Sequence, residues 1–183
     1  MEGCKKILYG VSDYARIRKE NGWFIDRTGF IRDLENTAFA LFLRPRRFGK
    51  SLLISILQSY YDVNYKARFK ELFAGTDIGE NPTDERGSYL ILDFNFSAVS
   101  KDVAKVQGSF DQYASDCIDR FAETYRKHLP KGLTQKVLAA KDCNTKLNRI
   151  TLGLKGRDVK LYVLIDEYDN FTNTILAESG QTA

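Results

Sequence analysis

The chain has 183 residues, of which 43% are hydrophobic and 28% are charged, and its formal net charge is +4. This length is enough for one sizeable core but not comfortably for two, and the small net charge argues against a protein that coats nucleic acid. No apolar run approaches the roughly eighteen residues of a membrane helix, so the sequence predicts no membrane span.

The first 36 residues are expected to form a lead-in of short elements. Ser12 or Asp13 can cap a helix that extends to Glu20, and a second short helix is predicted over about 29–35. Between them lies the short extended run 23–25 (Trp-Phe-Ile). These aromatic side chains either pack against the edge of a sheet, which is the commoner arrangement, or cover an adenine ring.

Residues 38–53 have the pattern of a buried strand, a basic loop and a helix. The six apolar residues 38–43 are typical of a central parallel strand, and apolar residues at helical spacing follow from Leu52 to Tyr60. The loop ends in Gly-Lys-Ser at positions 49–51, which is the ending of the phosphate-binding pattern G-x-x-x-x-G-K-[ST]. Arg44 stands where the first glycine of that pattern would be.

In a loop of this kind, backbone N–H groups and the lysine hold phosphates, and the final hydroxyl binds Mg²⁺. The candidate phosphate-binding residues are therefore Arg46, Arg47, Phe48, Gly49, Lys50, Ser51 and Leu52. Ser51 is also a candidate metal ligand. Two other interpretations stay open: the arginines belong to a solvated turn, or Arg46 and Arg47 contact the backbone of a nucleic acid.

The rest of the chain continues to alternate helices and strands. A helix over 66–73 and a polar connection over 75–87 precede a strand at 89–96. A long amphipathic helix follows from Val103 to near Pro130, and then come helices over about 133–141 and 145–154 and a strand at 161–165. The three cysteines, Cys4, Cys117 and Cys143, fit no metal or redox motif and favour a reducing cytoplasm.

The last predicted strand ends in two carboxylates, which is a Walker B pattern. Open α/β sheets place their ligands at the carboxyl ends of strands. Asp166 is therefore a candidate Mg²⁺ ligand, and Glu167 could orient and deprotonate an attacking water. Asp169 could join the metal shell or cap a turn.

Three stretches together resemble the prokaryotic AAA-ATPase-like family: residues 24–28 (FIDRT), 43–52 (LRPRRFGKSL) and 164–169 (LIDEYD). The resemblance extends from about Leu8 to Phe171 and includes the arginine at position 44. It implies an α/β fold: a P-loop NTPase with three α/β/α layers and a mainly parallel sheet. Residues 1–183 would form one domain, with 1–36 as the lead-in and 37–183 as the core.

The expected function is ATP binding and Mg²⁺-dependent hydrolysis, with Glu167 and Lys50 as the catalytic residues and Ser51 and Asp166 holding the metal. The domain would be a nucleotide-driven switch for an attached or partner effector. The alternatives are a nucleotide-binding module without turnover and a nucleic-acid-binding module that uses the loop 44–50. An oligomer is compatible with all three.

The resemblance also implies a longer protein, because family members often carry a C-terminal PD-(D/E)XK nuclease-like domain that could contact nucleic acid. The residues after Phe171 are too few for the crossover and strand that usually follow. We therefore expect this chain to be the N-terminal part of a longer protein. Its sheet should be incomplete at the C-terminus of the chain, and the chain alone should hydrolyse ATP poorly. Strands 38–43 and 161–165 should be parallel, with a strand-wide gap between them.

Overall fold

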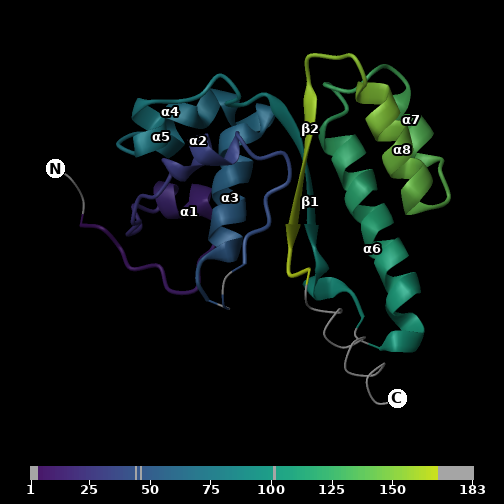
Figure 1. Cartoon of the computed structure of the whole chain (residues 1–183), viewed down its shortest axis with the longest axis horizontal. Helices are drawn as coiled ribbons and strands as arrows, with labels where there is room; N and C mark the ends of the chain where they lie inside the picture. Colours follow the sequence, from purple (N-terminus) through teal and green to yellow (C-terminus); the bar gives the residue numbers. More distant parts are fainter. Residues whose placement is uncertain (1–3, 44, 46, 101, 169–183) are drawn as a thin grey trace. The chain divides into compact units, whose positions relative to one another are not determined.

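The computed structural model describes residues 4–43, 45, 47–100 and 102–168. The chain divides into two compact units, Met1–Tyr89 and Leu90–Ala183, which we call the N-terminal unit and the C-terminal unit (Figure 1). In the described ranges, no helix is both long and apolar enough to cross a membrane.

The N-terminal unit is mainly helical. Its elements are α1 (Tyr14–Lys19), α2 (Phe30–Leu34), α3 (Lys50–Tyr61), the 3₁₀ helix η1 (Val63–Arg68), α4 (Phe69–Phe73) and α5 (Asp77–Glu80). The predicted helices at the positions of α1, α2 and α3 are confirmed, whereas the predicted helix 66–73 is divided between η1 and α4. Helix α5 lies inside the stretch predicted to be a polar connection, because the Thr76 side chain caps it by accepting a hydrogen bond from the Gly79 N–H.

Tyr14 joins three of these helices in the core of the N-terminal unit. Its side chain is fully buried. Its N–H donates to Ser55 Oγ on α3 at 2.8 Å, and its hydroxyl donates to the Leu72 carbonyl on α4 at 2.9 Å. Burial raises the pKa of this phenol. The ring also lies against Phe73, with 5.1 Å between ring centroids, so the backbone and side chain of this one residue fix α1 against α3 and α4.

The predicted strand 38–43 is wrong, because the structure has no strand there. All six residues are exposed, and the exposed fractions of Phe39 and Leu43 reach 95% and 70%. A strand must pair its backbone N–H and C=O groups with a neighbour. The described residues before Tyr89 contain only helices and isolated bridges, so the N-terminal unit has no such neighbour. The predicted strand-wide gap between strands 38–43 and 161–165 is therefore wrong as well, because the first of these two strands does not form.

The C-terminal unit has the α/β character that the sequence predicts. Its elements are β1 (Tyr89–Asn95, with Tyr89 still in the N-terminal unit), the 3₁₀ helix η2 (Phe96–Ala98), α6 (Val103–Thr124), α7 (Leu133–Leu138), α8 (Cys143–Leu154) and β2 (Lys160–Asp166). The two strands pair in parallel, which confirms both predicted strands (Figure 1). The three helices between β1 and β2 pack against one another.

Helix α6 is tied to β1 by two tyrosines. The Ile91 N–H donates to the hydroxyl of Tyr125 at 3.2 Å, and the Asn95 N–H donates to the hydroxyl of Tyr113 at 2.8 Å. Burial raises the pKa of Tyr113 to about 12. Because the two bonds lie near opposite ends of β1, they fix the direction of α6 along the strand.

Candidate functional site

The start of α3 carries the first half of the predicted site. Gly49 precedes the helix in a left-handed conformation with φ of +78°, and no described side chain caps the helix. An added Cβ at Gly49 would meet nothing within 4 Å. It is the positive φ that favours glycine here. The first N–H groups of a helix have no acceptor inside the helix, so an uncapped start suits an anion.

Lys50 is the first residue of α3 and is half-buried. Its side chain forms no ion pair or hydrogen bond with any residue that the structure describes. Ser51 is also half-buried, and Arg47 and Phe48 are exposed just before the helix. Arg44 and Arg46 lie outside the described residues. The arrangement leaves a cation beside the open helix start, which is the chemistry that a phosphate group requires.

An apolar hollow of about 510 Å³ adjoins this helix start. One wall is a face of α3, with Leu52, Leu53 and Ile56, and Gly49 lies at its edge. The opposite wall comes from α2 and the turn after it. The full lining is Phe24, Ile25, Arg27, Phe30, Asp33, Leu34, Thr37, Phe42, Phe48, Gly49, Leu52, Leu53 and Ile56. Apolar hollows of this size with a few polar groups are typical of small-molecule sites.

Two opposite charges line this hollow without pairing. Neither Arg27 nor Asp33 makes a side-chain hydrogen bond or ion pair with a described residue. Asp33 and Thr37 were not among the site residues predicted from the sequence. For Asp33 the available signal was spacing, because Phe30 lies three residues before Asp33 and four before Leu34, so the three share one side of α2.

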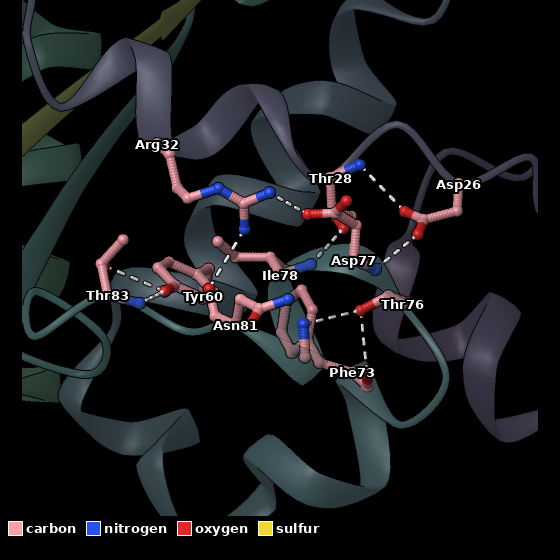
Figure 2. Close-up of polar contacts among 11 residues, drawn as sticks. Asp26, Thr28, Arg32, Tyr60, Phe73, Thr76, Asp77, Ile78, Asn81 and Thr83 are labelled. Atoms are coloured by element: carbon pink, nitrogen blue, oxygen red, sulfur yellow. Dashed lines mark hydrogen bonds and ion pairs between the residues drawn. The ribbon is translucent and has the colours of Figure 1, made fainter.

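The segment 24–28 has two structural roles (Figure 2). Phe24, Ile25 and Arg27 line the hollow, whereas Asp26 and Thr28 hold the start of α5. Asp26 accepts hydrogen bonds from the N–H groups of Thr28 at 2.9 Å and Asp77 at 2.7 Å. Partial burial alone would raise the pKa of Asp26, but these two donors outweigh it and lower the pKa.

Other contacts in Figure 2 fix the same corner of the N-terminal unit. The buried hydroxyl of Thr28 accepts a hydrogen bond from the Ile78 N–H at 3.1 Å. Arg32 of α2 pairs with Asp77 and donates to the Asn81 carbonyl at 3.1 Å. The polar half of the segment 24–28 therefore positions its apolar half beside the hollow.

The end of β2 carries the second half of the predicted site. Asp166 is buried, with 6% of its surface exposed, and its Oδ1 accepts a hydrogen bond from the Glu167 N–H at 2.9 Å. Glu167 is half-buried and has a left-handed backbone, with φ of +53°. Such a conformation is costly for a residue with a Cβ and often marks a functional position. Asp169 lies outside the described residues.

The structure thus groups the predicted residues in two places. Gly49, Lys50 and Ser51 meet at the start of α3 in the N-terminal unit, and Asp166 and Glu167 meet at the end of β2 in the C-terminal unit. Among the described residues, no cluster of three or more His, Cys, Asp or Glu side chains could hold a metal ion. The Asp166 carboxylate is an oxygen ligand of the kind that binds Mg²⁺, an ion that keeps several waters and is bound by one or two carboxylates and by phosphates.

Comparison with protein families identifies the class. A family model described as "Predicted AAA-ATPase" matches residues 8–183, so the chain belongs to the AAA-ATPase-like family. A similar curated protein is the "Uncharacterized protein in vnfD 5'region" of Azotobacter chroococcum mcd 1, which is 27% identical over 173 residues. The match covers 90% of this chain and 29% of that protein. No solved structure matches the chain.

Proposed function

We propose that this chain binds ATP with Mg²⁺, hydrolyses it, and serves as a nucleotide-driven switch for an attached or partner effector. Membership of the AAA-ATPase-like family supports the use of a nucleotide. The observation that carries the proposal is the start of α3, where Lys50 has no partner among the described residues and adjoins a left-handed Gly49 and a helix end that no described side chain caps. Positive charge and free N–H groups at one point are what a triphosphate needs.

Each predicted residue has a role in this proposal. Lys50 and the backbone of residues 46–52 hold the phosphates, and Ser51 and Asp166 hold Mg²⁺, which neutralises phosphate charge when it is bound. Glu167 accepts a proton from the attacking water and orients it. We further propose that residues 1–183 form one P-loop domain with three α/β/α layers.

Replacing Lys50 tests the phosphate site. A lysine–phosphate contact is a charge-assisted hydrogen bond worth roughly 1.5–3 kcal/mol, so Lys50→Ala should weaken MgATP binding at least about tenfold. Isothermal titration calorimetry measures this, and Lys70→Ala is the matched control, because Lys70 is exposed on α4 of the same unit, away from the hollow. Equal affinities for Lys50→Ala and the wild type would reject the phosphate site.

Two further measurements separate the proposed function from its alternatives. Glu167→Gln should keep ATP affinity and abolish phosphate release, because the carboxylate acts only on the water. If the wild type binds ATP but releases no phosphate, the chain is a binding module without turnover. Strongly salt-dependent DNA or RNA binding in the absence of nucleotide would instead favour a nucleic-acid module.

A further inference from the structure

We propose that the hollow between α2 and α3 is the purine subsite of the nucleotide site, and that Asp33 selects adenine by accepting a hydrogen bond from its exocyclic amine. This inference rests on the proposed function, because it assumes that the phosphates lie at the start of α3. It adds a specificity-determining residue that the phosphate loop alone does not supply.

The predicted phosphate-binding loop and the hollow are continuous. Gly49 and Leu52 belong both to the predicted phosphate-binding residues and to the lining of the hollow. A nucleotide whose phosphates meet the N–H groups around Gly49 therefore has its sugar and base beside Leu52 and Leu53. All of these residues belong to the N-terminal unit.

The lining of the hollow is rich in aromatic side chains. Four phenylalanines contribute to it: Phe24, Phe30, Phe42 and Phe48. The Phe24 ring packs edge-on against the buried ring of Tyr14, with 5.2 Å between ring centroids, and this contact holds Phe24 in place. Flat aromatic surfaces stack on nucleobases, but stacking accepts every base and so gives little selectivity. Selectivity requires a polar group at the edge of the base.

Asp33 is an exposed residue that lines the hollow. Its carboxylate has no partner among the described residues and does not pair with Arg27, which lines the same hollow. An ionised carboxylate only accepts hydrogen bonds. At position 6 of a purine the carboxylate therefore favours the amine of adenine, which donates. Guanine bound in the same orientation presents a carbonyl oxygen there, and unsubstituted purine presents only a hydrogen on carbon, so neither offers the carboxylate a donor at this position.

The test compares ATP with purine riboside 5′-triphosphate, which differs from ATP only by the missing amine. Calorimetry with Mg²⁺ should show about tenfold weaker binding of the analogue to the wild type, as expected for loss of one hydrogen bond to a charged group. In Asp33→Ala the two ligands should bind alike. Asp84→Ala is the control, because Asp84 is an exposed acidic residue of the same unit outside the hollow. It should keep the tenfold preference.

Each other outcome overturns the inference. If the wild type binds both ligands equally, or if Asp33→Ala keeps the preference, Asp33 does not recognise the amine. If GTP binds as tightly as ATP, the carboxylate does not select adenine. Inorganic tripolyphosphate separates this failure from failure of the proposed function, because its binding requires Lys50 but no purine subsite. Binding of neither tripolyphosphate nor ATP would overturn both.

Discussion

Helices α3 and α8 are both twelve residues long, but their first turns are built differently. The Asp142 side chain caps α8 by accepting hydrogen bonds from the Thr145 N–H and the Thr145 hydroxyl, both at 2.8 Å. Helix α3 follows Gly49, which has no side chain, and is uncapped in the described part of the chain. The Asp142 side chain thus satisfies part of the first turn of α8, whereas no described side chain caps the first turn of α3, where we propose that phosphates bind.

Giving α3 a cap like that of α8 should have the largest effect. In Gly49→Asp, the new carboxylate would compete with the phosphates for the N–H groups in the first turn of α3 and would also repel the phosphates. We expect MgATP affinity to fall about a hundredfold, at the upper end of what a hydrogen bond to a charged group contributes. The fold should persist, because there is space for a Cβ and aspartate tolerates a left-handed backbone better than most residues.

Gly132→Asp is the matched control for this change. Gly132 precedes α7 with φ of +80°, without a side-chain cap and without an atom within 4 Å of an added Cβ. The same substitution there imposes a similar backbone strain but places the charge in the C-terminal unit, at a residue that is not part of the loop 46–52. Calorimetry should find wild-type affinity. If both variants lose affinity equally, the effect comes from backbone strain and the comparison between α3 and α8 does not hold.

An intermediate effect is expected at α5, whose first turn is satisfied from outside the helix. Thr28→Val removes the hydroxyl that accepts from the Ile78 N–H and leaves a buried donor without a partner. The free energy of unfolding should fall by about 1–3 kcal/mol, as measured by urea denaturation. Thr37→Val is the control, because Thr37 is exposed at the hollow and makes no side-chain hydrogen bond in the described structure. Equal losses in both variants would contradict the structural role of Thr28.

The smallest expected effect is on the pH dependence of stability. The Thr145 N–H and hydroxyl lower the pKa of Asp142. A carboxylate with a lowered pKa stabilises the fold above its unfolded pKa, about 3.9 for aspartate, and this stabilisation is lost as the pH falls through the folded pKa. The melting temperature of Asp142→Asn should therefore fall less steeply below about pH 4 than that of the wild type. Parallel plots of melting temperature against pH for the wild type and Asp142→Asn would contradict this expectation.

Sequence reasoning succeeded where the signals are local. The boundaries of α3 and β2 follow from a glycine before one helix and from two carboxylates after an apolar run, and the structure has both elements. Adjacent residues such as Lys50 and Ser51 stay together in any fold. The resemblance to the AAA-ATPase-like family is likewise confirmed, because it rests on short contiguous stretches.

Features that depend on distant neighbours could not be predicted in the same way. Residues 38–43 have the composition of a strand, but a strand also needs a partner, and composition does not supply one. The hollow is lined by residues of both α2 and α3, and the sequence of neither helix specifies that arrangement alone. Asp33 has the appearance of an ordinary surface carboxylate until its neighbours in space are known.

The left-handed backbone at Glu167 has a consequence for how the family evolves. Glycine and asparagine adopt this conformation at less cost than glutamate, so replacing Glu167 by either one would relieve strain as well as remove the carboxylate. Selection for hydrolysis would oppose that drift, and a lineage that only binds nucleotide would not resist it. Under the proposed role of Glu167, the residue after the predicted Walker B aspartate, Asp166, should therefore separate family members by activity, with glutamate in those that hydrolyse ATP and glycine or asparagine accumulating in those that do not.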